Sequence, residues 1–489
     1  MTIDTLPDDV LLDIFEWYLE ENPGIDGLEE WHTLVHVCRN WRSIVFRSPR
    51  RLNLRLLCDG RRPVRGKLDC WPPLPIVIYG WKHEMLRVSD IVAAFEQNDR
   101  VCQVLLWDIS SSLLERVLAL MQQSFPALTS LRLSSDDNEA PALSDSFLGG
   151  SAPRLQYLQL NCIPFPGLPK LLLSATGLVT LRLRHIPHSG YFSPEVMVIA
   201  LSASTRLEEF ELTFQSPRSR PGRERRRPLP PTRSVFRALT HFEFHGVSEY
   251  LEDLVARIDA PLLDLLDITF FHQVIFHTPK LAQFISRTPR LKARDEARVT
   301  FYSQTAVVTL PSPHISRRGI LELKISCKQS DWRLSSMAQI CSSSLSLVSS
   351  LERLYVCEKE YLQSCWQGDI EDVQWLELLR PFTTVKTLYL SREFAPRIAP
   401  ALQELVGGRV TEVLPTLRTL SLEQLHPSSA VQEAIEKFVA ARQLSGHPIV
   451  ISRWDRNQFK RYEVDDWSVL STRYRIHIEH HPTCHQCYS

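Results

Sequence analysis

The chain has 489 residues with 56 basic and 56 acidic side chains, so its formal net charge is zero. A neutral chain has no overall field that would draw it to nucleic acid or to an anionic membrane. No apolar run approaches the about 20 residues of a membrane-spanning helix, and Met1 is not followed by a basic and then apolar segment. We therefore expect a soluble protein that is not secreted.

The cysteines indicate a reducing compartment. There are eleven of them, an odd number, and most are scattered along the chain without paired spacing. In a chain of this length such cysteines are usually reduced and mostly buried. We expect a cytoplasmic and/or nuclear protein.

The first fifty residues contain two amphipathic helical patterns. The first starts at Pro7, which suits a first helical position, with acidic residues beside the positive end of the helix. Its apolar residues recur at helical spacing up to Phe15, and a second apolar face runs from Leu34 to Val45. Short helices in so few residues bury little surface. They form either a cap on the following domain or a docking module.

An ordered series of short motifs favours the docking module. Leu-Pro at 6–7, Ile-Phe at 14–15, Val-Cys-Arg-Asn-Trp-Arg at 37–42 and Ser-Pro at 48–49 together resemble an F-box. The resemblance implies binding to a Skp-type adaptor, which joins a cullin and a RING subunit. The stretch at 20–30 is longer than is usual for an F-box. The family's apolar, adaptor-binding positions correspond to Leu6, Pro7, Val10, Leu11, Ile14, Phe15, Leu34, Val37, Cys38 and Trp41.

A degenerate repeat follows from about residue 100. The unit is Leu-x-x-Leu-x-Leu or an apolar equivalent, and from the copy at Leu128 to the one at Leu263 successive copies start 23 to 32 residues apart. This spacing is typical of leucine-rich repeats or slightly longer. Clear copies start at Leu128, Leu155, Leu178, Leu207, Leu239, Leu351 and Leu417, and weaker ones at Val101, Leu263, Ile320 and Val385.

Each copy predicts a short strand whose leucines enter the core, and segments such as 112–124 and 194–204 have helical spacing. We expect an α/β fold in which helical F-box residues precede an irregular leucine-rich-repeat-like solenoid with a curved parallel sheet. One feature departs from the family. The position eight after the start, usually Asn or Cys, holds Asp136, Ile163, Ile186, Gln215 and Val247 in five copies.

These patterns give a domain plan: an F-box at 1–50, a linker with the first strands at 51–100, the substrate-binding solenoid at 101–451 and a C-terminal tail at 452–489. The arrangement, including the Ser-Pro-Arg-Arg-Leu junction at 48–52, resembles the large F-box protein sets of mushroom-forming fungi. In that group the domain after the F-box is expected to hold a target.

Residues 215–233 form an Arg/Pro-rich insertion with seven arginines, five prolines and one acid. Such a composition cannot form a packed core, so we expect a disordered, exposed loop. The basic cluster at 223–227 leaves nuclear import or nucleic-acid contact as alternatives. No aromatic residue lies among these arginines for base stacking.

The tail carries His480, His481, Cys484, His485 and Cys487. The two cysteines have the spacing of half a zinc site, but a second pair at comparable spacing is missing. We expect a loose terminus and no metal or other cofactor.

No sequence motif indicates catalysis. A Gly-x-Ser-x-Gly elbow, a glycine-rich phosphate loop and His-Glu-x-x-His are all absent, and no cysteine stands in a nucleophile signature. We expect a non-catalytic subunit.

The alternation of strand residues predicts where a target binds. In each repeat the residues flanking the second leucine must point away from the core. Their mixture of charges and tyrosines suits a protein partner. The rule selects Arg132, Tyr157, Gln159, Arg182, Glu209, Glu211, His241, Glu243, Arg353, Tyr355 and Tyr389.

The resemblance and the repeat together predict a substrate-recognition subunit of an SCF-type cullin-RING ubiquitin ligase, leading to proteasomal degradation of an unknown protein substrate. Three alternatives stay open: an F-box scaffold acting outside a ligase, a solenoid nucleic-acid binder using the Arg-rich loop, and an enzyme with an unrecognised site.

Overall fold

In the computed structural model, the described part of the chain is residues 6–20, 26–59, 63–81, 87–137, 140–166, 168–218, 232–273, 275–291, 294–302, 304–311, 320–327, 330–344, 351–358, 371–423 and 429–454. Within these ranges no helix has the length and apolar character to cross a bilayer. The tail's cysteines and histidines, and most of the Arg/Pro-rich insertion, lie outside them.

The chain divides into two compact units between Asp136 and Asp137. The N-terminal unit combines the first helices with four strands, β1 to β4, which pair in parallel in chain order. Its elements are α1 (Asp8–Glu20), η2 (Asp26–Glu29), α2 (Trp31–Val37), α3 (Arg39–Arg47), β1 (Leu56–Cys58), α4 (Val64–Cys70), β2 (Ile76–Trp81), α5 (Val88–Phe95), β3 (Val101–Ile109), α6 (Ser111–Leu120) and β4 (Ser130–Ser135).

The C-terminal unit alternates strands and helices. Its first half contains η3 (Phe147–Gly150), β5 (Tyr157–Asn161), α7 (Leu168–Ser174), β6 (Thr180–Ile186), η4 (His188–Gly190), α8 (Pro194–Leu201), β7 (Glu209–Phe214), β8 (Ser234–Val235), β9 (His241–Gly246), α9 (Ser248–Val255), β10 (Ile258–Asp259), β11 (Leu265–Phe271), α10 (Pro279–Arg287) and η6 (Pro289–Leu291). Its second half contains β12 (Glu296–Phe301), β13 (Thr305–Leu310), β14 (Ile320–Ser326), α11 (Ser330–Ser344), β15 (Arg353–Glu358), α12 (Asp372–Leu379), β16 (Thr387–Leu390), α13 (Ala395–Gln403), η8 (Gly407–Arg409), β17 (Thr419–Glu423), α14 (Ser429–Leu444) and β18 (Val450–Trp454).

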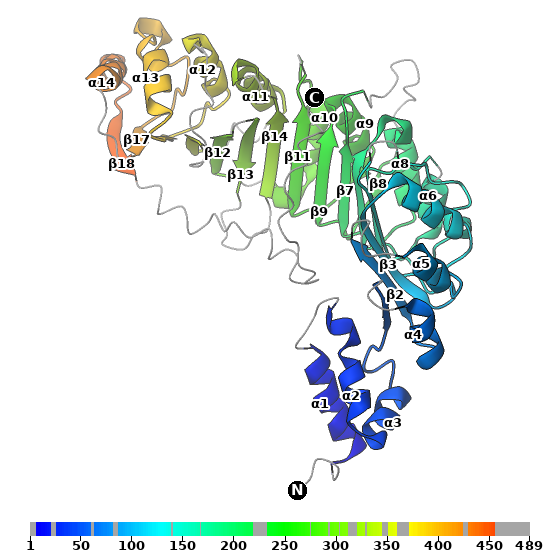
Figure 1. The fold of residues 1–489 in the computed structure, drawn as a ribbon. Coiled ribbons are helices and arrows are strands. Elements are labelled where there is room, and N and C mark those ends of the chain that lie inside the picture. Colours follow the sequence, from blue (N-terminus) through cyan, green and yellow to red (C-terminus); the bar gives the residue numbers. More distant parts are fainter. Residues whose placement is uncertain are drawn as a thin grey trace. The chain divides into compact units, whose positions relative to one another are not determined.

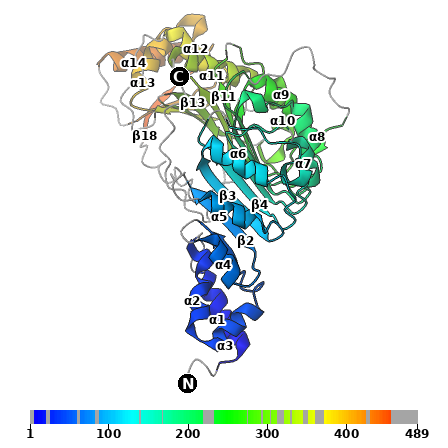
Figure 2. The same ribbon diagram turned by 45° about the vertical axis from the view of Figure 1, so that its right-hand side comes forward.

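A large, curved and mainly parallel sheet runs through this unit, with helices along one of its faces (Figures 1 and 2). The strand order is β5-β6-β7-β9-β11-β14-β13-β12-β15-β16-β17-β18. This arrangement is consistent with the predicted leucine-rich-repeat-like solenoid. The predicted parallel sheet is parallel in the main but not throughout, because β13 runs antiparallel to both β12 and β14. The inserted hairpin lacks the leucine repeat, so the repeat pattern did not reveal it.

The repeat leucines form the core, as predicted. Leu158, Leu160, Leu181 and Leu183, from two successive copies, are completely buried. The helical spacing predicted at 112–124 and 194–204 corresponds to α6 and α8. At the position eight residues after the start of the repeat, where the usual polar ladder is missing, Ile163, Ile186 and Val247 are buried instead.

Threonine and arginine side chains connect neighbouring repeats by hydrogen bonds to main-chain carbonyls. The hydroxyls of Thr240 and Thr416 donate to the main-chain carbonyls of Glu208 and Thr383, at 3.1 and 2.9 Å. The guanidinium of Arg442 on α14, which is fully buried, donates to the carbonyls of Val410, Pro415 and Leu417 at 3.0–3.3 Å. Arg287 on α10 donates in the same way to Val255 and Ile258. Each of these bonds reaches back about one repeat.

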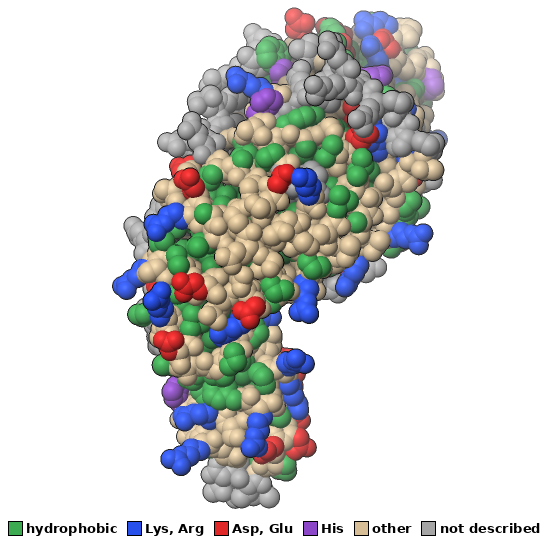
Figure 3. All heavy atoms as spheres, turned by 90° about the vertical axis from the view of Figure 1, so that its right-hand side faces the viewer, with side chains coloured by type: hydrophobic (Ala, Val, Ile, Leu, Met, Phe, Trp, Pro, Cys, Tyr) green, Lys and Arg blue, Asp and Glu red, His purple; other side chains and the backbone are tan. Residues whose placement is uncertain are grey.

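Charged side chains are interspersed over the face shown in Figure 3. Among the described residues on that face, basic and acidic groups do not gather into a patch of one sign. This pattern agrees with the zero net charge of the chain.

Candidate protein-interaction surfaces

Three apolar side chains lie exposed along one face of α1. Val10 is 38% exposed, Ile14 is 39% exposed and Trp17 is 63% exposed. Residues four and three positions apart lie on the same side of a helix, so these side chains form one stripe. Val37, the last residue of α2, is also exposed. We call Val10, Ile14, Trp17 and Val37 the apolar stripe.

The opposite side of α1 holds the helices together. Leu11 and Phe15 are completely buried, and the Phe15 ring packs 4.7 Å from the Trp41 ring on α3. The indole Nε1 of Trp31 on α2 donates to the carbonyl of Arg55 at 2.9 Å. These contacts fix the three helices to one another and to the segment that leads into β1.

A buried lysine joins η2 and α4 to the first strand. The Lys67 ammonium on α4 donates to the Glu29 carboxylate at 2.6 Å and to the Leu57 carbonyl at 2.8 Å. Asp59 lies 3.8 Å from the same nitrogen. An isolated buried ammonium is costly, so both carboxylates stabilise this position. The N-terminal unit is thereby tied together from η2 to β1.

The structure sorts the ten predicted adaptor-binding residues into three groups by exposure. Their role in binding an adaptor stays a prediction, and the buried group can act only by supporting the surface. Exposed are Pro7, Val10, Ile14 and Val37; half-buried are Leu6, Cys38 and Trp41; buried are Leu11, Phe15 and Leu34. Trp17 was missed because it lies outside the quoted motifs, although its spacing from Ile14 could have revealed it.

An open groove of about 410 Å³ adjoins the apolar stripe at Val37. It is lined by His32, Thr33, His36, Val37 and Trp71. The His32 ring stacks on Trp71 with centroids 4.8 Å apart and planes 12° apart. The groove is therefore lined mainly by aromatic and imidazole rings.

The second surface is the polar face of the C-terminal unit's sheet. Leucines alternate with polar and aromatic residues along each strand, and strand register aligns those residues into a row across twelve strands. In strand order the row is Gln159, Arg182, Glu211, Glu243, Asp267, Glu322, Thr309, Arg298, Tyr355, Tyr389, Ser421 and Ser452.

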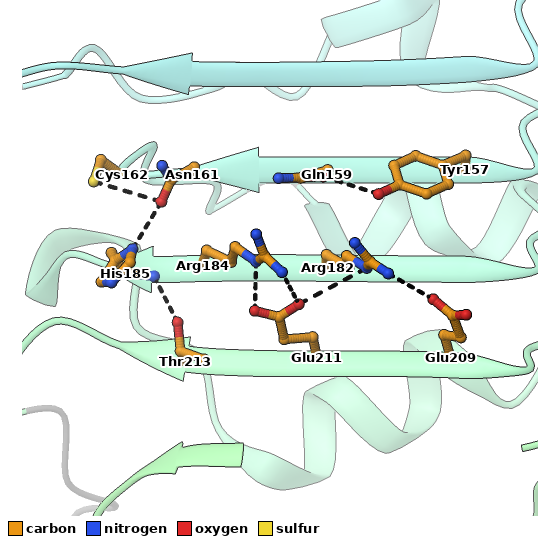
Figure 4. A network of polar contacts seen from close by, with 10 residues as sticks. All are labelled: Tyr157, Gln159, Asn161, Cys162, Arg182, Arg184, His185, Glu209, Glu211 and Thr213. Carbon is orange, nitrogen blue, oxygen red and sulfur yellow. Dashed lines mark hydrogen bonds and ion pairs between the residues drawn. The ribbon is translucent and has the colours of Figure 1, made fainter. Parts of the chain in front are cut away.

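Two arginines of β6 pair with two glutamates of β7 (Figure 4). The Arg184 guanidinium donates to both Glu211 oxygens, at 2.5 and 2.7 Å. Arg182 donates to Glu209 at 2.9 Å and lies 3.8 Å from Glu211. Burial lowers the pKa of Arg184, but the charge and hydrogen bond of Glu211, together with the charges of Glu243 and Tyr157, raise that pKa above its ordinary value. Such bidentate pairs fix both side chains.

The carboxyl ends of β5 and β6 carry further polar contacts. The Nδ1 atom of His185 lies 2.9 Å from the side-chain oxygen of Asn161. The main-chain N–H of His185 donates to the Thr213 hydroxyl. Its φ of 48° is in the left-handed region, where the register with β7 shifts. Burial, with the nearby Arg184 charge, lowers the pKa of His185.

Glu243 on β9 is the next member of the row. Its neighbours in register are Glu211 on β7 and Asp267 on β11. Burial, followed by the charges of Glu211 and Asp267, raises the pKa of Glu243 to about 7. On the far side, Asp267 pairs with Lys324 of β14 at 2.7 Å.

Aromatic rings occupy the other end of the row. Tyr355 and Tyr389 stack with centroids 4.1 Å apart and planes 9° apart. Trp454 on β18 packs edge-on against both rings, at 5.9 and 5.7 Å. The Arg298 guanidinium lies 5.8 Å from the centre of the Tyr355 ring. This end of the face is therefore a packed aromatic cluster.

The structure gathers most of the predicted substrate-binding residues on this face. Tyr157, Gln159, Arg182, Glu209 and Glu211 lie together in Figure 4. His241 and Glu243 follow on β9, and Arg353, Tyr355 and Tyr389 lie on β15 and β16. Arg132 belongs to β4 of the N-terminal unit.

Exposure corrects part of that prediction. The alternation rule implied side chains open to solvent, but Gln159, Glu211 and Tyr355 are each less than 10% exposed. They are covered partly by packing and pairing with their neighbours. Arg184, Asp267, Glu322 and Lys324 were missed, although extending the same alternation one step along the strands, or to the weaker copies, could have found them.

The described residues contain no group of three or more side chains placed to hold a metal ion. Burial raises the pKa of the Cys341 thiol to about 12, and that of Cys58 to the same value. A nucleophilic cysteine needs a lowered pKa, so these two thiols are poor candidates for catalysis.

No protein-family model and no curated protein matches the chain. The F-box resemblance of residues 1–50 therefore rests on the motifs themselves. Among solved structures, the chain is similar to the leucine-rich repeat-containing protein LegL7 from Legionella pneumophila. The match has 13% identity, covers 81% of this chain and 99% of that chain, and has a TM-score of 0.26. A score this low carries no weight, so the repeat architecture rests on the strands described above.

Proposed function

We propose that the chain is the substrate-recognition subunit of an SCF-type cullin-RING ubiquitin ligase. In this proposal the apolar stripe binds a Skp-type adaptor, and the polar sheet face binds the target protein. The chain supplies no chemistry of its own. It raises the rate of ubiquitin transfer by holding the target near the charged conjugating enzyme, which makes a bimolecular encounter local.

The exposed stripe carries the adaptor half of the proposal. Isolated exposed apolar residues are ordinary, but Ile14 and Trp17 form a contiguous strip on one helix within the F-box-like motifs. Tryptophan is among the most frequent energetic anchors of protein interfaces. A partner with an apolar groove would remove this surface from water.

The sheet face supports the target half. Its row combines tyrosines, arginines and carboxylates on a rigid scaffold, a composition that favours specific recognition of protein. The interspersed acids disfavour a phosphate backbone as the partner.

The test is capture of a purified Skp-type adaptor by the full chain carrying Ile14→Ala and Trp17→Ala. Interface anchors cost about 2 kcal/mol or more each, so losing both should weaken binding by about 1000-fold. The matched control is Val196→Ala with Ile199→Ala, which removes two exposed apolar side chains from α8. Undiminished capture by the folded α1 double variant would contradict the proposal. Co-purification of a cullin with the wild type distinguishes a ligase subunit from a scaffold outside a ligase.

A further inference from the structure

The polar sheet face has an excess of negative charge between β6 and β14. Strand register places five carboxylates and three cations of these strands on the same face. The carboxylates are Glu209, Glu211, Glu243, Asp267 and Glu322, and the cations are Arg182, Arg184 and Lys324.

The three cations are all used by four of the carboxylates. Arg182 and Arg184 pair with Glu209 and Glu211, as described above. Lys324 lies 2.7 Å from Asp267 and 3.4 Å from Glu322. The remaining carboxylate is Glu243, which has no hydrogen bond or ion pair with any residue in the described part of the chain, although the charges of Arg184 and Lys324 act on it.

Glu243 also lies in the middle of the group. Adjacent strands are about 4.8 Å apart, so Glu211 and Asp267 flank it closely on either side. Asp267 is 4% exposed, and its Oδ1 has no hydrogen-bond partner within the described ranges. Two neighbouring carboxyl groups therefore have acceptor oxygens without donors. A positively charged group with several N–H donors would satisfy both.

We propose that Glu243 is the docking point for a lysine or arginine side chain of the target protein. The inference rests on the proposed function, because it assumes that the polar sheet face receives the target. A basic side chain placed beside Glu243 would balance the excess charge of the face. Its N–H groups would donate to carboxylate oxygens that now lack a partner.

A protein side chain fits this position better than other cations or polyanions. Among the described residues no cluster is placed to ligate a metal ion. A phosphate backbone would be repelled by the excess carboxylates. His241 lies on the same strand as Glu243 and Tyr157 lies on β5 of the same sheet, and both give a peptide further contacts of the kind that protein interfaces use.

The first experiment selects binders to the full chain from a library of random-sequence short peptides. The selected peptides are resynthesised with glutamine in place of each lysine or arginine, and affinities are measured by fluorescence anisotropy. For the wild type, one such replacement should weaken binding about tenfold or more. With Glu243→Gln the same replacement should have little effect. Glu377→Gln on α12, an exposed residue on a helix, is the control for the same change in net charge.

The second experiment measures the affinity of a selected basic peptide from pH 6 to pH 8. Glu243 is mostly protonated at pH 6 and mostly ionised at pH 8, because its pKa is about 7. The affinity for the basic peptide should therefore rise about tenfold across this range. The groups whose charges act on Glu243 are Glu211, Asp267, Arg184 and Lys324.

The Glu243→Gln variant separates the effect of Glu243 from that of the histidines on the same face, which it keeps. Burial lowers the pKa of His245 to about 4, so this histidine stays neutral from pH 6 to pH 8. Burial also lowers the pKa of His185 below its ordinary value. Glu243→Gln should give a flat profile.

Three outcomes would overturn the inference: peptides selected without a basic preference, a Glu243→Gln variant that keeps both the preference and the pH profile, or calcium or magnesium raising the melting temperature only when Glu243 is present. Adaptor capture is measured separately through the apolar stripe. A failed peptide test with intact capture therefore rejects the docking point alone, and loss of capture by the wild type rejects the proposed function.

Discussion

The two candidate surfaces differ in how their side chains are satisfied. On α1, the apolar stripe is exposed while its neighbours Leu11 and Phe15 are fully buried. On the sheet, Arg184 and Glu211 satisfy each other across strands, and Glu243 is left between two acids. Any partner that excludes water from the apolar stripe binds it with a favourable free energy. The sheet face binds favourably only a partner that places a positive charge beside Glu243, so it can discriminate between targets.

The largest expected effect is on stability, and it distinguishes buried from exposed residues of α1. Phe15→Ala removes a buried ring that packs on Trp41 and should destabilise the N-terminal unit by about 3–5 kcal/mol. Trp17→Ala, in contrast, should change stability by only about 0.5 kcal/mol. Hydrogen exchange of residues 6–47 measures both. Similar exchange rates in the two variants would mean that the helical core is not organised around Phe15.

A smaller effect tests whether the ion pairs of the sheet face are structural. Glu211→Ala leaves the partly buried Arg184 without its bidentate partner and should cost about 2 kcal/mol, less than a fully buried pair because Arg184 is partly exposed. Glu209→Ala removes a more exposed carboxylate and should cost less than about 1 kcal/mol. Denaturant unfolding of both variants gives the comparison, and equal losses would show that burial does not distinguish the two pairs.

The smallest effect depends on pH. The folded-state pKa of Glu243 is raised from 4.5 to about 7, so the folded state holds the proton more tightly than the unfolded state. Its contribution to stability is full below about pH 4.5 and is lost as the pH rises through 7. At pH 8, Glu243→Gln should be more stable than the wild type by about 1–2 kcal/mol, after allowance for partial exposure.

At pH 4.5 the two proteins should unfold at nearly the same denaturant concentration. A constant difference at all pH values would show that Glu243 is not electrostatically strained. That result would also remove the physical basis for a docking point there.

The strands could be predicted from the sequence, because Leu158, Leu160 and their equivalents repeat with a spacing that only one side of a strand explains. The sequence could not predict which side chains of adjacent strands lie beside each other. Alternation indicates that Arg184 points away from the core, but nothing in the spacing indicates that Glu211 lies beside it, since register depends on how separate repeats stack. The hairpin of β12 and β13 was missed for a similar reason, because its valines follow no leucine repeat. Which of the F-box-like residues are buried and which are exposed could not be predicted either, because that depends on how the helices pack.

The threonine and arginine bonds to main-chain carbonyls have a mechanical consequence. Thr240, Thr416, Arg287 and Arg442 each connect one repeat to the turn before it. A chain fastened only between neighbours behaves as a one-dimensional array, in which a break weakens the adjoining repeat first. Unfolding of the repeats should therefore start at the β18 end and proceed inward one repeat at a time. Arg442 makes the last of these bonds among the described residues.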